Sequence, residues 1–169
     1  MLFDDCCEIL HDRVNIKELR PITENEYFVR GSTALLDAIG KTISRAGNAQ
    51  KQADEDRRAD KVMFVITTDS MENASREYSY HRIREMIERQ KAKYGWEFIF
   101  LGANIVAIAT AVKFGIDADR AANYHADSKG TQLNYEAVSN FACNLRQNKC
   151  NDASWKNKID EDYKKRGKK

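Results

Sequence analysis

The sequence predicts an α/β domain with a doubly wound, mostly parallel sheet. From residue 61 onward, apolar runs typical of strands alternate with segments of helical periodicity, in the order strand, helix, strand, helix, strand, helix. That alternation is the pattern of parallel sheets joined by right-handed crossovers. The run at residues 62–66, Val-Met-Phe-Val-Ile, is apolar without interruption, which is typical of a strand covered by helices on both faces.

Before residue 31, the sequence predicts only a short hairpin. Residues 2–10 alternate loosely between apolar and polar side chains. They predict a short antiparallel hairpin at one edge of the sheet, with Asp4 and Asp5 at its bend. Residues 11–30 show no regular pattern.

The first helix is expected to begin after Gly31. Ser32 or Thr33 can cap it, because a side-chain oxygen can accept a free N–H of the first turn. Gly47 is its expected end. Residues 48–60 are almost entirely polar, so we expect them to form an exposed loop.

The remaining elements are predicted from apolar runs, glycine stops and polar caps. We expect strands at 62–66, 96–101 and 121–125, a helix capped by Ser79 and closed by Gly95, a helix at 105–114 and a last helix capped by Thr131.

Length and charge limit the number of domains and the kinds of partner that the chain can have. Residues 1–148 are expected to form one domain, and residues 149–169 a basic, disordered tail, because the end of the chain is rich in lysine and poor in apolar side chains. The net charge of +2 is too small to indicate a nucleic-acid partner. No apolar run approaches the ~20 residues that cross a bilayer, and no signal peptide is visible, so we expect a cytoplasmic protein without a membrane partner.

Two polar residues are placed where chemistry is expected. In open parallel sheets, ligands sit at the carboxyl ends of the strands. Asp69 follows the most apolar strand, and a carboxylate there is a common ligand of a divalent cation, although it can equally cap a helix or face solvent. Thr33 begins a helix, so its hydroxyl can be a cap, a metal ligand or both, and position alone favours the cap.

Three segments carry a family resemblance when they are taken together. They are residues 31–40 (GSTALLDAIG), 65–75 (VITTDSMENAS) and 96–104 (WEFIFLGAN). In this order they resemble the threonine loop with its helix, the aspartate loop and the following strand of von Willebrand factor A domains of the bacterial and phage type. The resemblance covers roughly residues 1–148.

The resemblance implies a metal-ion-dependent adhesion site. In the family, Mg²⁺ or Mn²⁺ is held by an Asp-x-Ser-x-Ser loop, a threonine from a second loop and an aspartate from a third, and an acidic side chain of the partner completes the shell. By matching motifs, Thr33 and Asp69 would be the second- and third-loop ligands. The rim of such a site would include Ser32, Ser70, Asn73 and Asn104.

The sequence departs from the family pattern in two ways. Ser70 stands where the family usually has glycine, and no Asp-x-Ser-x-Ser occurs in the chain. The chain therefore resembles the family from its second strand onward, and we expect the fold to be N-terminally truncated, without the first strand, metal loop and first helix. One carboxylate and one hydroxyl are too few for a dedicated Mg²⁺ site, so metal binding should be weak. A strand-supplying partner or a preceding segment is expected to compensate for the missing strand.

The predicted function is a metal-ion-dependent protein-binding module, used for adhesion or as a scaffold, with an incomplete metal site and an unidentified protein partner. A scaffold fragment that binds no metal is one alternative. The other is a doubly wound nucleotide-handling enzyme. Against the enzyme, the sequence contains no GxxxxGK[ST] or GxGxxG phosphate loop and no GxSxG elbow.

Overall fold

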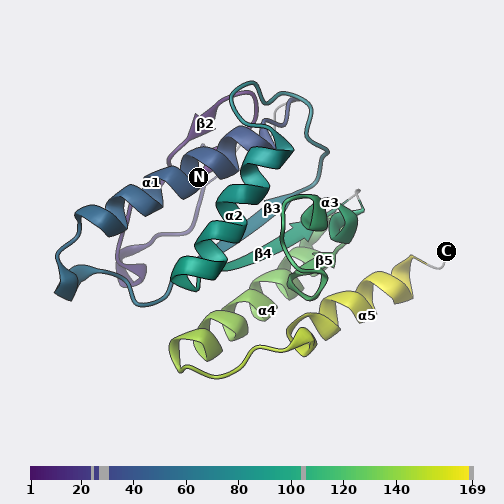
Figure 1. The fold of residues 1–169 in the computed structure, drawn as a ribbon. Coiled ribbons are helices and arrows are strands. Elements are labelled where there is room, and N and C mark those ends of the chain that lie inside the picture. The colour runs from purple at the N-terminus through teal and green to yellow at the C-terminus, as the bar shows by residue number, and fades with distance from the viewer. Residues whose placement is uncertain (24, 27–30, 104–105, 168–169) are drawn as a thin grey trace.

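The computed structural model describes residues 1–23, 25–26, 31–103 and 106–167. These residues form a mixed α/β structure with a three-stranded parallel sheet, a separate two-stranded antiparallel sheet and five α-helices (Figure 1). None of the described helices is both long enough and apolar enough to cross a membrane. The strands are β1 (Leu2–Phe3), β2 (Cys7–Glu8), β3 (Met63–Thr68), β4 (Glu97–Gly102) and β5 (Ala121–Asn123). The helices are α1 (Leu35–Gln52), α2 (Tyr80–Tyr94), α3 (Ala107–Lys113), α4 (Ser128–Arg146) and α5 (Asn157–Arg166).

The central sheet has the strand order β3-β4-β5, and both pairs of neighbours are parallel. Helix α2 connects β3 to β4, and α3 connects β4 to β5. This confirms the predicted alternation and the parallel sheet, because a parallel pair needs such a crossover.

Side chains alternate between the two faces of the sheet and build two apolar clusters. On one face, Ile66 and Phe100 pack with apolar residues of α1, α2 and α3. On the other face, Ile99 and Leu101 pack with residues of α4 and α5, such as Phe141. Helices therefore cover both faces of β4, which explains why that strand is apolar from Phe98 to Leu101.

Strand β3 is covered less completely than β4. Val65 pairs with Ile99 and Thr67 with Leu101, so the four side chains share a face. Ile99 is 0% exposed and Leu101 2%, whereas Val65 is 39% exposed and Thr67 is also exposed. Helices α4 and α5 thus leave the β3 side of this face open to solvent.

The N-terminal hairpin is present but does not extend the main sheet. Phe3 pairs with Cys7 in an antiparallel ladder, as predicted. Within the described residues, β1 and β2 form a sheet of their own, so the expected antiparallel hairpin is present but is not hydrogen-bonded to the main sheet. The hairpin contacts α1 instead, because the Ala34 N–H donates to the Asp4 carbonyl at 2.6 Å.

Helix α1 differs from its prediction at both ends. Its N-cap is Ala34, without a side-chain bond, so neither Ser32 nor Thr33 caps it. It also continues through Gly47 to Gln52, so the expected loop starts later than predicted. A helical glycine costs only about 1 kcal/mol, which the packing of the same helix can offset.

The ends of α2 and the start of α4 show whether the capping residues were predicted correctly from the sequence. Ser79 caps α2 by accepting from the Arg82 N–H, and Gly95 closes it with a φ of 62°, both as predicted. Helix α4 is capped by Asp127 and not by Thr131. Aspartate caps as well as threonine does, and Asp127 comes first along the chain.

The prediction of a disordered tail at residues 149–169 is wrong for most of that segment. Ala153–Lys156 forms a 3₁₀-helix, and α5 follows it. Ile159 of α5 is only 2% exposed and belongs to the cluster beneath α4. Lys149, Lys158, Lys164 and Lys165 are exposed to solvent, whereas apolar side chains such as Ile159 hold the segment on the sheet.

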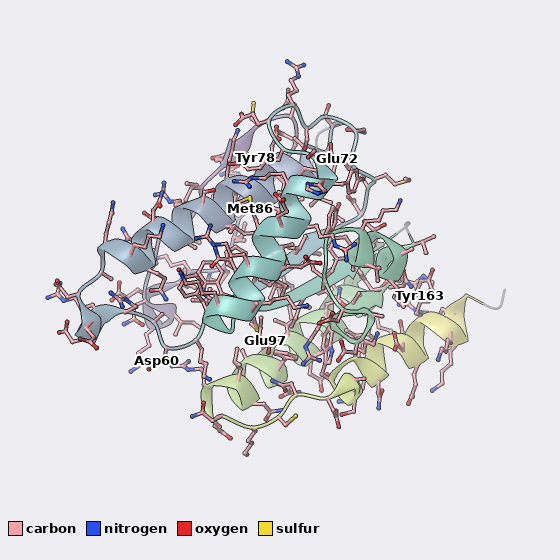
Figure 2. All side chains as sticks on the ribbon, viewed as in Figure 1. Asp60, Glu72, Tyr78, Met86, Glu97 and Tyr163 are labelled. Carbon is pink, nitrogen blue, oxygen red and sulfur yellow. The ribbon has the colours of Figure 1, made fainter. Side chains whose placement is uncertain are left out.

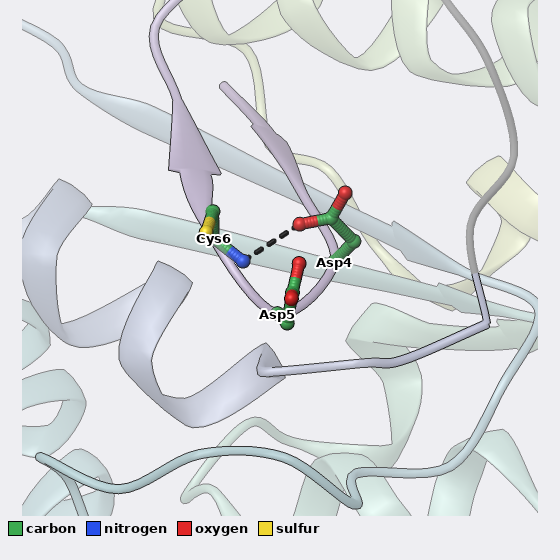
Figure 3. Close-up of side chains that lie close together, drawn as sticks. All are labelled: Asp4, Asp5 and Cys6. Carbon is green, nitrogen blue, oxygen red and sulfur yellow. Dashed lines mark hydrogen bonds between the residues drawn. The ribbon is translucent and has the colours of Figure 1, made fainter.

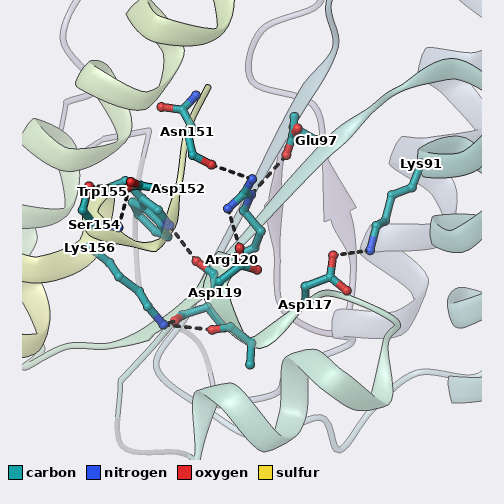
Figure 4. A network of polar contacts seen from close by, with 12 residues as sticks. Lys91, Glu97, Asp117, Asp119, Arg120, Asn151, Asp152, Ser154, Trp155 and Lys156 are labelled. Atoms are coloured by element: carbon teal, nitrogen blue, oxygen red, sulfur yellow. Dashed lines mark hydrogen bonds and ion pairs between the residues drawn. The ribbon is translucent and has the colours of Figure 1, made fainter. Parts of the chain in front are cut away.

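Polar contacts hold this segment against the turn before β5 (Figure 4). The Trp155 indole N–H donates to the Asp119 carbonyl at 2.7 Å, and the buried Lys156 ammonium donates to the Ala121 carbonyl. Arg120 donates to the Asn151 carbonyl at 2.9 Å. These contacts join segments more than thirty residues apart, so no short sequence window reveals them.

Two glycines of α1 predict opposite effects of the same substitution. A Cβ at Gly40 would lie 2.4 Å from ring carbons of Tyr78, whereas a Cβ at Gly47 would meet nothing within 4 Å. We expect Gly40→Ala to lower the free energy of unfolding by about 1–3 kcal/mol through overpacking. Gly47→Ala should raise it by about 0.5–1 kcal/mol through helix propensity. Urea unfolding of both variants measures the difference, and equal signs would show that Tyr78 does not pack on α1.

Candidate functional site

The threonine and aspartate loops meet at the carboxyl end of β3. The Asn73 Oδ1 accepts from the Thr33 N–H at 2.9 Å, and the Asn73 N–H donates to the Thr33 carbonyl at 3.1 Å. Asp69 directly follows β3 at the same end of the sheet. Two loops far apart in sequence are thus joined by reciprocal backbone contacts.

Glu72 caps α1 from the aspartate loop. Its carboxylate accepts from the Leu36 N–H at 2.8 Å, and within its own loop it accepts from the Ala74 and Ser75 N–H groups at 3.0 and 2.7 Å. A carboxylate at a helix N-terminus satisfies a free N–H and interacts favourably with the helix dipole. This contact explains why α1 needs no cap from its own sequence.

Asp37 makes the reverse connection from α1 to the loop. It is 6% exposed, and its carboxylate accepts from the N–H groups of Arg76, Glu77 and Tyr78 at 2.9, 3.0 and 2.9 Å. Burial raises the pKa of Asp37, but the three N–H bonds outweigh it, so the pKa lies below its ordinary value. The ionised side chain therefore holds residues 76–78 against the first turn of α1.

The two predicted metal ligands have different surroundings. Thr33 is 8% exposed, at the start of α1. Asp69 is exposed, and its carboxylate accepts from the Ser70 hydroxyl at 3.2 Å. The Ser70 N–H donates to the Thr68 Oγ1 at 3.3 Å, so Ser70 forms part of a tight turn.

The predicted rim residues are only partly brought together. Asn73 binds the backbone of Thr33, and Ser70 lies beside Asp69. Ser32 is half-buried next to Thr33. Asn104 lies outside the described residues.

The donor set at this end does not fit a dedicated Mg²⁺ or Mn²⁺ site. Mg²⁺ requires near-octahedral oxygen ligands, usually with one or two carboxylates held in place. Among the described residues, Thr33 offers one largely buried hydroxyl and Asp69 one exposed carboxylate. The carboxylates of Asp37 and Glu72 already accept backbone N–H groups. In the part of the chain that the structure describes, Asp69 belongs to no group of three His, Cys, Asp or Glu side chains that could hold a metal ion.

A second cluster of acidic side chains lies at the bend of the hairpin (Figure 3). Ligand atoms of Asp4, Asp5 and Cys6 lie within 4.8 Å of one another. The Asp4 Oδ1 accepts from the Cys6 N–H at 2.6 Å, so this carboxylate stabilises the turn. Asp5 and Cys6 are exposed, and an exposed acidic turn of this kind is common without a metal.

The sequence did not single out the two acids that build this end of the molecule. Asp37 carries the only detectable signal, because it is a charged residue in the first turn of an otherwise apolar helix start (ALLDAIG). Glu72 lies in a polar turn and has no such signal. Both act on segments that are 36 to 41 residues away.

Comparison of the chain with protein-family models, with curated proteins and with solved structures found no match.

Proposed function

We propose that this chain is a protein-binding module of the von Willebrand A type, with a doubly wound fold, and not an enzyme. The observation that carries the proposal is the reciprocal bonding of Thr33 and Asn73, which joins the threonine and aspartate loops at the carboxyl end of a parallel sheet. Ligands of open α/β sheets bind at that end. Asp37 and Glu72 fix the two loops to each other, which prepares a rigid surface for a partner.

The hydrogen bonds that Asp37 and Glu72 already make favour a binding role over a catalytic one. Asp37 and Glu72 direct their oxygens at backbone N–H groups, so neither is free to act as a general base. Asp69 is exposed and contacts only a neighbouring hydroxyl among its described contacts. The chemistry that remains at this end is hydrogen bonding and apolar contact.

Exposed apolar side chains at the same end support a protein partner. Met71 in the aspartate loop is 71% exposed, and Val106, which precedes α3, is 70% exposed. They follow β3 and β4 respectively, so both lie beyond the carboxyl end of the sheet. Large apolar side chains in solvent mark contact sites when they gather near one another. The partner in this proposal is an unidentified protein that presents an acidic side chain with apolar neighbours.

The open face of β3 supports a second feature of the proposal. Val65 and Thr67 are exposed on a strand whose neighbour is fully buried. Because parallel sheets usually have both faces covered, we propose that a strand and helix from a partner or from a further segment cover this face. The fold would then be the complete doubly wound sheet of the family.

Metal titration tests the proposed site. We expect Mg²⁺ and Mn²⁺ to bind more weakly than about 1 mM in titration calorimetry, because Thr33 and Asp69 supply too few ligands. Weak Mn²⁺ binding that disappears in Asp69→Ala would agree with a remnant site. Saturable micromolar binding that disappears in Asp69→Ala would contradict an incomplete site.

The same samples separate the alternatives. Complete absence of binding at high Mn²⁺ would favour a metal-free scaffold, which the small donor set also allows. Turnover of ATP or GTP, lost in Asp69→Ala and retained in a variant of an exposed remote acid such as Asp56→Ala, would show that the protein is an enzyme.

A further inference from the structure

A groove lies between the C-terminal half of α1 and the facing side of α2, from Arg82 to Tyr94. The two helices lie close at their N-terminal ends and diverge toward their C-terminal ends (Figure 1). At the close end, the ring of Tyr78 lies where a side chain at Gly40 would be (Figure 2). The diverging parts, with the segment at residues 58–62, enclose a volume of about 1180 Å³. Val62 and Trp96 line it and precede β3 and β4, so the groove lies at the opposite end of the sheet from Thr33 and Asp69.

The inner part of the groove is apolar. Ile43 of α1 is 1% exposed and Trp96 is 5% exposed, and Met86 lies between the two helices in Figure 2. Gly47 also lines the groove, and no atom lies within 4 Å of the position that its Cβ would take. The groove therefore has room for an apolar side chain of a ligand.

Cations on the rim of the groove lack carboxylate partners. Lys51, Arg58 and Arg89 line it and are exposed. Arg58 donates to the carbonyls of Gln50 and Ala53 at the end of α1, which fixes its guanidinium without neutralising it. None of the three cations forms an ion pair with a described residue.

The acids of the groove do not balance these cations. Glu85 pairs with Arg82 at 3.2 Å, and Glu88 pairs with Arg84 at 2.7 Å. Asp60 is the remaining acid among the described lining residues. The rim therefore carries an excess of positive charge, and it is complementary to an acidic ligand.

Besides the apolar floor and the positive rim, the groove has a buried hydrogen-bond acceptor, which sets a third requirement for a ligand. The side chain of Gln90 lines the groove, and its Oε1 is buried without a hydrogen-bond partner in the described structure. Buried polar atoms are rarely left unpaired. Because this oxygen has almost no accessible surface, a ligand N–H group reaches it only after the Gln90 amide turns toward the groove.

We propose that this groove binds an acidic peptide segment of a partner protein, which inserts a large apolar side chain over Met86 and Trp96. The apolar floor takes the side chain, and the unpaired cations take the flanking carboxylates. Gln90, once its amide turns toward the groove, accepts a peptide N–H. A peptide meets all three requirements together, as in other recognition of short segments by grooves between helices. This site is independent of the function proposed for the opposite end of the sheet.

Fluorescence anisotropy with labelled synthetic peptides of about twelve residues tests the proposal. The probe alternates Glu and Asp with one Phe and one Leu, and its counterparts replace the acids with Lys or the apolar residues with Ala. We expect saturable binding of the probe, and binding at least about tenfold weaker for either counterpart. Equal binding of the lysine counterpart, no saturation by the probe, or tighter binding of a single-stranded RNA at this groove would overturn it.

Matched variants locate the binding without depending on unfolding. Gly47→Phe fills the groove from a position that meets no atom within 4 Å, whereas Gly47→Ala leaves it open. We expect the Phe variant to weaken binding at least about tenfold and the Ala variant to leave it nearly unchanged. Lys51→Glu combined with Arg89→Glu should weaken it similarly. Unchanged affinity in Gly47→Phe, with thermal melting showing a folded protein, would overturn the site.

A control pair separates local from overall charge. Lys149→Glu combined with Lys164→Glu changes the net charge equally at exposed positions that do not line the groove. We expect this pair to bind the acidic probe nearly as the parent does. An equal loss in both double variants would mean that only net charge attracts the probe, which would overturn the proposal.

Discussion

Asp37→Ala is expected to lower the free energy of unfolding by about 3–4 kcal/mol. The carboxylate of Asp37 accepts three backbone N–H groups, from Arg76, Glu77 and Tyr78. Bonds to a charged group contribute about 1.5–3 kcal/mol each, although such contributions are not additive. The loss is a large fraction of the ~5–15 kcal/mol that stabilises a typical domain. Urea unfolding at neutral pH measures it.

Two control variants show whether the loss of stability in Asp37→Ala comes from its hydrogen bonds. Asp37→Asn keeps the shape and one acceptor oxygen, so it should cost less, about 1–2 kcal/mol. Asp56→Ala removes an exposed acid and should change stability by less than about 0.5 kcal/mol. A change below 1 kcal/mol in Asp37→Ala would mean that residues 76–78 are not held by this side chain.

The pH dependence identifies the ionised carboxylate as the cause. The pKa of Asp37 is lower in the folded chain than its ordinary value. Its contribution is therefore fully present above the unfolded-state pKa, about 3.9, and is lost as the pH falls through the lower folded-state pKa. The stability difference between the parent protein and Asp37→Ala should shrink as the pH falls below about 4. A difference that is constant with pH would point to packing instead.

Covering the open side of β3 is expected to raise the free energy of unfolding by several kcal/mol. The Glu97 N–H donates to the Val62 carbonyl, and the Ala103 N–H donates to the Thr68 carbonyl. The backbone N–H and C=O groups of the even-numbered residues in this segment therefore point toward β4. The N–H and C=O groups of Val65 and its odd-numbered neighbours therefore point to the other edge. About five hydrogen bonds at ~1 kcal/mol each and a few apolar side chains at ~1.5–3 kcal/mol each are available there.

A fusion tests this expectation. A strand with its crossover helix needs about 30 or more residues, so a segment of that size from a von Willebrand A domain, including its Asp-x-Ser-x-Ser loop, is joined to the N-terminus. We expect the melting temperature to rise by about 10 °C, since 1 kcal/mol corresponds to about 2–4 °C at this size. Mg²⁺ should raise it further, because a ligand of the native state stabilises that state.

Matched segments show which part acts. A proline in the added strand should abolish the rise, because it removes a ladder hydrogen bond and breaks the strand. Alanines in place of the Asp-x-Ser-x-Ser side chains should keep the rise but remove the Mg²⁺ effect. If the unaltered segment raises the melting temperature neither alone nor with Mg²⁺, the chain is a self-sufficient domain of another kind.

Features that depend on neighbouring residues were predictable from the sequence. The strand at 62–66 was predicted from a continuous apolar run, and the strand at 96–101 from a run that only Glu97 interrupts. Ser79 and Gly95 were assigned to the ends of α2 because a cap acts on groups within one turn of the helix. The parallel order followed, since alternating strands and helices can be connected in few ways.

Tertiary structure alone decided the features that depend on distant residues. Ser32 or Thr33 was the predicted cap of α1, but Glu72, which is 36 residues from its partner Leu36, supplies the cap. Residues 153–166 have the composition of a tail, yet Ile159 is buried because α4 and the sheet provide an apolar surface for it. Local signals state which conformations a segment favours, whereas the free energy of a long-range contact depends on which surface arrives beside it, and that is set by the fold.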